Sequence, residues 1–258
     1  MTETSKQHFQ AVVDAGQSAV FSGWDFSWLE GRMVQEIPSW DYTELVKAML
    51  VNAHSLLDMG TGGGEFLASL APLPPDTHAT ESYPPNQPIA QRRLAPMGVT
   101  VHPVDEDGPL PFDNSRFDVV INRHESYNPK EVYRILKPGG RFLTQQVGEL
   151  DNLELNLLLD PQKLQPLTDW GLETETAKLC ETGFIISQAE KAALRTSFMD
   201  IGAVVYYLKA ISWQIEGFTL EGYHRQLLML HHWIQSHGPL ITTAHRFLIL
   251  AHKEASLS

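Results

Sequence analysis

Residues 55–67 of the 258-residue chain read SLLDMGTGGGEFL and carry the strongest structural signal in the sequence. A short apolar run, Ser55 to Leu57, ends in the acid Asp58, and a glycine-dense turn follows. From Phe66 onward the apolar spacing is that of an amphipathic helix. The stretch therefore predicts a strand, a tight loop and a helix, the first unit of a doubly wound α/β fold that binds its ligand at the carboxyl end of the strand.

The spacing of the glycines indicates the kind of ligand. A dinucleotide-binding loop has the pattern G-x-G-x-x-G, but in that register Glu65 stands where the third glycine belongs. The glycines instead lie at positions 60, 62 and 64, and Gly60 is two residues after Asp58. An acid in the loop suits a ligand with an ammonium and a sulfonium, and it would repel a pyrophosphate. A structural or nucleotide-binding loop is the alternative interpretation.

Composition and charge limit the classes of function. The chain has 19 Lys and Arg against 31 Asp and Glu, a net charge of −12, so we expect a small-molecule substrate and no nucleic-acid partner. The single cysteine, Cys180, excludes an intramolecular disulfide and fits a reducing compartment. The N-terminal residues lack the pattern of a signal peptide, and no apolar run reaches the length of a membrane span. We therefore expect a soluble, cytoplasmic protein without a membrane partner.

Two further stretches make a family resemblance visible. Residues 110–120 read LPFDNSRFDVV, and residues 134–143 read RILKPGGRFL. Together with the D-x-G-x-G-x-G loop they resemble class I S-adenosylmethionine-dependent methyltransferases, in the group that includes quinone-biosynthesis C-methyltransferases. The resemblance covers roughly residues 54–147, in the order and spacing of that family. It makes a dehydrogenase the weaker interpretation.

The resemblance implies roles for individual residues in binding S-adenosyl-L-methionine. The loop with Gly60, Thr61, Gly62 and Gly64 would wrap the methionine part. Glu81, with Ser82 beside it, ends the second predicted strand and would bind the ribose diol; a surface acid is the alternative. Asp105 or Glu106 would meet the adenine amino group, and both stay candidates because residues 105–109 are one residue longer than the family segment. Asn122 would lie by the methionine end. The complete set is Asp58, Gly60, Thr61, Gly62, Gly64, Glu81, Ser82, Asp105, Glu106 and Asn122.

A polar cluster directly after the fourth predicted strand supplies the catalytic candidates. His124 or Glu125 could remove a proton from an attacking oxygen or nitrogen, and Tyr127 could orient the substrate. The alternative is that these residues cap the next helix and pair with Arg123 or Arg134. Transfer to an atom that is already nucleophilic needs no base, because alignment of donor and acceptor supplies much of the rate.

The rest of the chain is expected to complete the fold and recognise the substrate. We expect one domain, residues 1–258, with an N-terminal helical cap or lid (1–50), a cofactor-binding core (51–149) and a C-terminal part (150–258). The predicted sheet has seven mostly parallel strands, and a helical insertion separates the sixth from an antiparallel last strand. Trp24, Phe26, Trp28 and Trp213 are the substrate candidates. His224 and His231 lie too far apart on one helix to share a metal ion, so we expect no metal site.

These observations predict methyl transfer from S-adenosylmethionine to an apolar or aromatic small molecule, giving S-adenosylhomocysteine. Two alternatives remain open. An RNA-base methyltransferase would have the same core but a positive surface around the cleft. A non-catalytic S-adenosylmethionine-binding protein would bind the cofactor without turnover.

Overall fold

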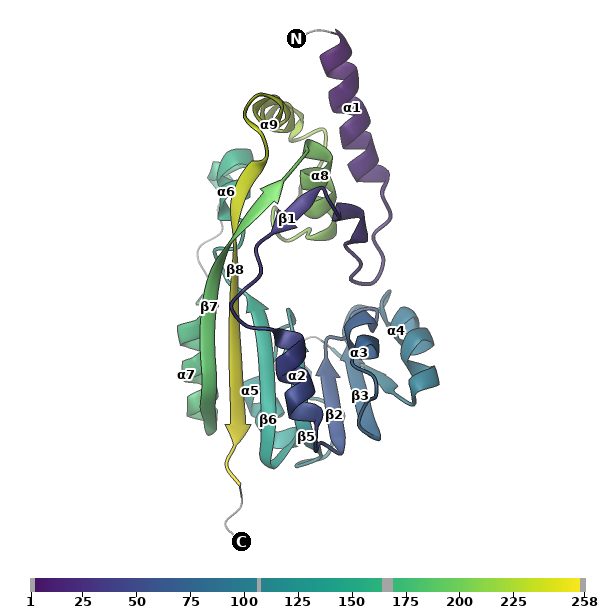
Figure 1. Ribbon diagram of the computed structural model, residues 1–258, viewed down its shortest axis with the longest axis vertical. Coiled ribbons are helices and arrows are strands. Elements are labelled where there is room, and N and C mark those ends of the chain that lie inside the picture. The colour runs from purple at the N-terminus through teal and green to yellow at the C-terminus, as the bar shows by residue number, and fades with distance from the viewer. Residues whose placement is uncertain (1–2, 106–107, 164–168, 256–258) are drawn as a thin grey trace.

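The computed structural model describes residues 3–105, 108–163 and 169–255, and its centre is one eight-stranded sheet (Figure 1). The strand order is β1-β7-β8-β6-β5-β2-β3-β4. The five parallel neighbours are β6 (Leu136–Val147), β5 (Phe117–Arg123), β2 (Ser55–Met59), β3 (Asp76–Glu81) and β4 (Thr100–Pro103). The expected doubly wound, mostly parallel α/β fold is confirmed.

Helices cover both faces of this sheet because neighbouring residues of a strand point to opposite sides. Leu56 faces a core formed with α2 (Tyr42–Leu50), α3 (Glu65–Ser69) and α4 (Gln87–Leu94). Leu57 faces a second core, formed with α5 (Pro129–Ile135) and α7 (Leu172–Thr182). Both leucines are fully buried, as expected for a parallel sheet between two helical layers.

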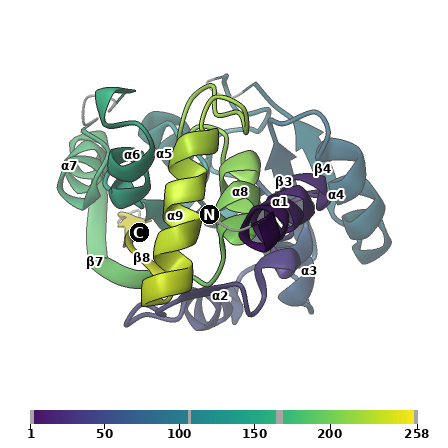
Figure 2. The ribbon, with the colours of Figure 1, turned by 90° about the horizontal axis from the view of Figure 1, so that it is seen from above.

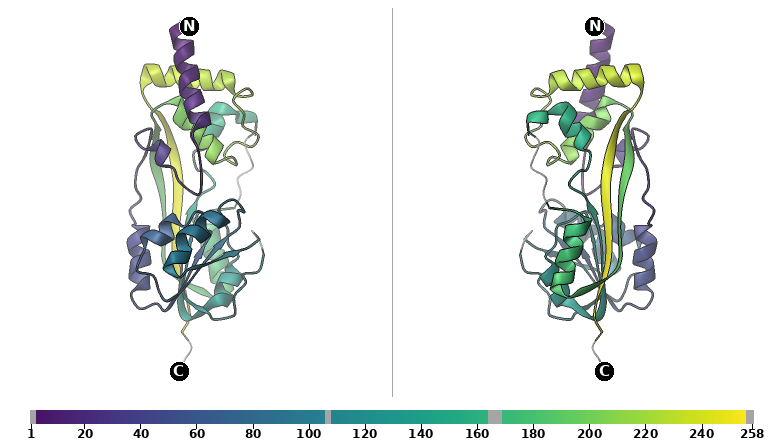
Figure 3. Two further views of the ribbon diagram at one scale, coloured as in Figure 1. Left: turned by 90° about the vertical axis from the view of Figure 1, so that its right-hand side faces the viewer. Right: turned by 90° about the vertical axis from the view of Figure 1, so that its left-hand side faces the viewer.

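A long hairpin extends the sheet beyond the other strands and carries a helical cap. β7 (Phe184–Phe198) and β8 (Leu240–Lys253) pair along their whole length, and β8 is also antiparallel to β6. The cap helices are α1 (Glu3–Ser18), α6 (Leu153–Leu159), α8 (Ile201–Ala210) and α9 (His224–His237). They gather at one end of the molecule, opposite the C-terminus (Figures 2 and 3). The predicted helical insertion and antiparallel last strand are confirmed.

Two details differ from the sequence-based expectation. The sheet has an eighth strand, β1 (Met33–Gln35), inside the segment expected to form only the cap. It pairs antiparallel with Thr196–Phe198, where the end of β7 would otherwise be an open edge. In addition, α5 ends at Ile135, although residues 131–140, with Pro138 and a glycine pair, predict from sequence a helix that ends at Lys137. The residue before Pro138 is disfavoured in helical conformation, so the chain becomes extended earlier.

Short 3₁₀ turns complete the described structure at Ser27–Leu29, Ala95–Met97 and Pro161–Lys163. Within the described ranges, no helix combines the length and apolar character needed to cross a membrane.

Candidate active site

A cavity of about 790 Å³ lies between the carboxyl ends of the parallel strands and the cap. It includes the junction of β2 and β5, where the chain changes direction of winding and where ligands bind in open α/β sheets. The core side contributes Asp58, Gly60, Thr61, Gly62, Glu81, Ser82, Asp105, Arg123, His124 and Glu125. The cap side contributes Phe21, Trp24, Lys209 and Trp213. Most of the residues proposed from sequence therefore lie around one space.

The glycine loop is shaped by backbone conformations that other residues rarely adopt. Gly60, Gly62 and Gly64 have φ angles of 66°, 62° and 80°. Packing adds a second constraint, because a Cβ on Gly60 would lie 2.5 Å from the Cβ of Glu125. A Cβ on Gly64 would lie 2.9 Å from Leu94, and α3 begins directly after this glycine. The loop can thus turn sharply and keep its backbone open to the cavity.

Two buried acids stand at the ends of β2 and β3. Asp58 Oδ2 accepts a hydrogen bond from Thr61 Oγ1 at 2.8 Å. Burial raises the pKa of Asp58 to about 6, although this hydrogen bond and the charge of Arg123 act in the opposite direction. Glu81 accepts hydrogen bonds from the backbone N–H groups of Gly62 (2.6 Å) and Tyr83 (2.8 Å). Burial also raises the pKa of Glu81, against these two bonds. Both carboxyls would gain from a cationic or hydrogen-bond-donating ligand.

Asp105 lines the main cavity and also a smaller adjoining pocket of about 110 Å³. Ser82 and Glu125 line both spaces as well, and Ser82 Oγ donates to Glu125 Oε1 at 3.1 Å. Glu106, the other adenine candidate, lies outside the described residues. That Asp105 or Glu106 meets the adenine amino group therefore stays a prediction, with both acids as candidates.

The residues at and after the end of β5 separate into two groups. Arg123, His124 and Glu125 line the main cavity, whereas Tyr127 lines only the smaller pocket. Burial, and next the charge of Glu175, raise the pKa of Tyr127. The side chain of Asn122 is fully buried and accepts hydrogen bonds from Thr144 and Gln146, so it lies away from the cavity lining. Asn122 lines neither cavity, so its place by the methionine end of the cofactor stays a prediction.

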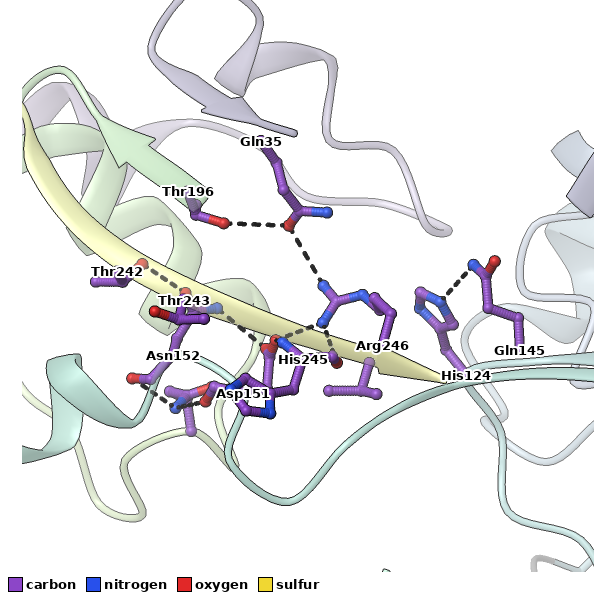
Figure 4. Close-up of polar contacts among 12 residues, drawn as sticks. Gln35, His124, Gln145, Asp151, Asn152, Thr196, Thr242, Thr243, His245 and Arg246 are labelled. Carbon is purple, nitrogen blue, oxygen red and sulfur yellow. Dashed lines mark hydrogen bonds and ion pairs between the residues drawn. The ribbon is translucent and has the colours of Figure 1, made fainter. Parts of the chain in front are cut away.

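His124 has an unusual setting (Figure 4). Its φ of 63° is in the left-handed region, which a non-glycine residue seldom occupies without support from its surroundings. Its Nε2 lies 3.2 Å from Gln145 Nε2, and Gln145 Oε1 accepts from Trp40 Nε1 at 2.7 Å. Burial first, and then the charges of Arg246 and Arg123, hold the pKa of His124 well below its usual value. The ring is therefore neutral at physiological pH.

The four aromatic substrate candidates also divide into two groups. Trp24 and Trp213 line the cavity and stack with ring centroids 6.2 Å apart and an interplanar angle of 7°. Phe26 packs on Trp24, and Trp28 stacks on Tyr206 under the guanidinium of Arg32. Phe26 and Trp28 thus contribute to the core of the cap, whereas Trp24 and Trp213 border the cavity.

Some lining residues were not expected from sequence to line the cavity. Arg123 is the last residue of β5, and its guanidinium lies 4.4 Å from the ring centroid of Phe66, a position that its place at the strand end could have suggested. Phe21 lies in the segment expected to form the N-terminal cap or lid, whereas Lys209 reaches the cavity from α8, and no local pattern indicates that. Lys209 Nζ donates to the carbonyl oxygens of Gln17 and Ala19 and so ties α8 to the loop after α1.

Comparison with known proteins agrees with this geometry. Residues 57–144, which include the glycine loop and the strands β3 to β6, match the family model described as a methyltransferase domain. No curated protein is significantly similar to the chain in sequence.

Solved structures share the fold at low sequence identity. A protein of Bacillus halodurans described as a candidate methyltransferase is 18% identical; the match covers 83% of this chain and 97% of that chain, with a TM-score of 0.60. A Galdieria sulphuraria protein described as a candidate sarcosine dimethylglycine methyltransferase is 16% identical, with coverages of 98% and 99% and a TM-score of 0.51. The cyclase SpnF is 15% identical, with coverages of 98% and 96% and a TM-score of 0.53. At these identities the similarity establishes the fold.

The fold, the glycine loop and the family match together define a class I methyltransferase domain. Residues 57–144 match a methyltransferase domain, and this match and the shared fold support the methyltransferase activity that the sequence motifs predict.

Proposed function

We propose that the chain binds S-adenosyl-L-methionine in the 790 Å³ cavity and methylates a small molecule with apolar or aromatic character. The observation that carries this proposal is the meeting of acidic strand ends and an aromatic cap around one space. Its volume lies in the upper part of the range of about 300–1,000 Å³ that small-molecule sites occupy.

The residues present suit this cofactor chemically. Asp58 and the glycine loop would hold the part that carries the ammonium group, Glu81 would accept hydrogen bonds from the ribose hydroxyls, and Asp105 would border the adenine. When bound, the cofactor supplies a methyl group on a positively charged sulfur. The carboxylates around the cavity stabilise the positive charge of the bound cofactor before the reaction. Alignment of the acceptor with the methyl group is a separate task, which other side chains of the cavity must perform.

The cap supports a small acceptor. Trp24 and Trp213 present stacked rings at the cavity, and the loop that carries Trp24 also packs against Gly62. Such rings favour flat or apolar groups. Because a cyclase shares the fold, the fold alone does not assign the acceptor chemistry, and the cavity lining must do so.

Calorimetric titration with S-adenosylhomocysteine tests the cofactor site. We expect micromolar affinity for the unmodified chain and a loss of at least tenfold for both Glu81→Gln and Asp58→Asn, because each change removes a charge or acceptor that faces the ligand. Glu254→Gln, an exposed acid at the opposite end of the molecule, is the matched control and should bind normally. Equal affinity in all variants would mean that the ligand binds elsewhere.

The same material separates the two alternative functions. A binding-only protein would retain affinity for S-adenosylhomocysteine but release none of it from S-adenosylmethionine with any acceptor. Turnover with a panel of small aromatic acceptors, lost in Glu81→Gln, would establish transfer at this cavity.

A further inference from the structure

His124 was a candidate base, and its hydrogen bonds indicate a different role. The ring nitrogen Nε2 faces the side-chain amide of Gln145 (Figure 4), and the other end of this amide is bonded to Trp40. Chemistry alone determines which group donates and which accepts in each of these two hydrogen bonds, beginning at Trp40.

An indole N–H can only donate a hydrogen bond. The atom of Gln145 that lies 2.7 Å from Trp40 Nε1 must therefore be the carbonyl oxygen, which settles the orientation of the amide. The NH₂ group of Gln145 then points at His124 Nε2, at 3.2 Å. An NH₂ group has no lone pair to offer, so Nε2 must be the acceptor. A neutral ring with an accepting Nε2 carries its proton on Nδ1.

This tautomer leaves His124 without a free basic nitrogen. Its lone pair is engaged by Gln145, and the remaining nitrogen, Nδ1, carries a hydrogen. Among the described residues no hydrogen-bond partner of Nδ1 is present, and the atom is not sealed from solvent. Since His124 lines the cavity, this N–H is available to a ligand. Neutral histidine in such a setting polarises an oxygen and does not take a proton.

The charges around the ring favour an acceptor atom with negative charge. Arg123 precedes His124 in the chain, and Arg246 comes from β8 beside it (Figure 4). Two acids also lie nearby, but each is engaged: Asp151 forms an ion pair with Arg246, and Glu125 accepts from Ser82. After burial, the charges of Arg246 and Arg123 oppose protonation of the ring, and the same two charges attract an oxyanion.

We propose that His124 is a hydrogen-bond donor that holds an anionic oxygen of the methyl acceptor on Nδ1–H, and that Trp40 and Gln145 are positioning residues that fix this tautomer. The acceptor class is then a small molecule with a carboxylate, phenolate or enolate oxygen. This deepens the proposed function and rests on it for the identity of the ligand, while the tautomer itself is a property of the free protein.

Nitrogen-15 NMR of the histidine rings tests the tautomer without any turnover. The chain has eleven histidines, so the His124 signals are assigned by their loss in His124→Gln. We expect a protonated Nδ1, a bare Nε2 and no titration near pH 6.5. In Gln145→Glu, a carboxylate oxygen replaces the NH₂ group, so the proton should move to Nε2 and the pKa of His124 should rise.

Gln91→Glu is the matched control, because it makes the same change at an exposed position on α4 and should leave the His124 signals unchanged. Trp40→Phe removes the donor that orients the amide, and should give a mixture of both tautomers. An Nε2–H form in the unmodified protein, titration near pH 6.5, or an unchanged tautomer in Gln145→Glu would each overturn the assignment.

Matched ligands test the preference for an anionic oxygen. With S-adenosylhomocysteine present, benzoate and 4-nitrophenolate should shift the Nδ1–H signal of His124 more than their neutral partners benzamide and 4-nitroanisole. If neither anion exceeds its partner, the oxyanion assignment fails. That failure is distinct from failure of the cofactor site, which the calorimetric titration reports separately.

Discussion

At the scale of single residues, Asp58 shows a conflict between folding and ligand binding. It is 5% exposed, and one hydrogen bond from Thr61 does not offset the burial of its charge. Burial in the free protein therefore makes the ionised carboxyl costly and raises its pKa to about 6, while a cationic ligand would favour the ionised form. A buried acid with a pKa displaced upward at a strand end is typical of a functional site.

This conflict predicts that Asp58→Asn stabilises the ligand-free protein. The pKa rises from 3.8 to about 6 on folding, so the stabilising contribution of the protonated carboxyl is complete below pH 3.8 and is lost as the pH rises through about 6. At pH 8 the asparagine variant should be more stable by up to about 3 kcal/mol, at ~1.4 kcal/mol for each pKa unit. Urea unfolding measures the difference.

The pH dependence provides the control for that measurement. The advantage of Asp58→Asn should shrink as the pH falls from 8 to 5, because the carboxyl of the unmodified protein then regains its proton. If the free energies of unfolding of the two proteins differed by the same amount at all pH values, the effect would come from packing and not from the charge.

At the scale of elements, the cap depends on one close contact between helices. α1 and α8 cross where Gly16 meets Gly202, and a Cβ on Gly202 would lie 2.5 Å from the carbonyl oxygen of Val12. A Cβ on Gly16 would meet the backbone of Gly202 even more closely. Both glycines have ordinary φ angles, so the requirement comes from the neighbouring helix and not from backbone conformation.

We therefore expect Gly16→Ala to push α1 away from α8 at a cost of about 1–3 kcal/mol. The loop that carries Trp24 follows α1, so faster proteolysis and hydrogen exchange should appear in residues 3–30 and not in β2 or β5. Gly171→Ala is the control, since a Cβ there meets nothing within 4 Å and the φ of −162° suits any residue. Uniform destabilisation of the whole sheet would contradict a local role.

At the scale of the whole molecule, the net charge of −12 and the acidic cavity act together. Basic residues at the cavity are few, and two of them are partly engaged: Arg123 lies over Phe66, and Lys209 donates to two carbonyl oxygens. A polyanion would have to approach the site against the overall field.

We accordingly expect no binding to transfer RNA at physiological salt in an electrophoretic shift assay, at protein concentrations that saturate S-adenosylhomocysteine. Adding salt should make no difference, because no counterions are released. A salt-sensitive shift that is lost when Arg123 is replaced by Gln would instead favour an RNA-base methyltransferase.

Much of the fold and part of the site could be predicted from the sequence because their signals are local. The glycine loop, the capping of α2 by Asp41, and the Gly183 stop of α7 depend on residues within a few positions of one another. The placement of Asp58, Glu81 and Asp105 around one space follows from topology, since parallel strands end at the same edge.

The sequence by itself determined the fold class, the motifs of a methyltransferase domain and the acids at the strand ends, because periodicity and turn chemistry depend on consecutive residues. Only the tertiary structure decided that Trp24 and Trp213 border the cavity while Phe26 and Trp28 fill the cap, that β1 closes the edge of β7, and that Trp40 and Gln145 reach His124. Those relations join segments far apart in the chain, and only the packing of the cap, the long hairpin and the helical layers on the sheet brings them together.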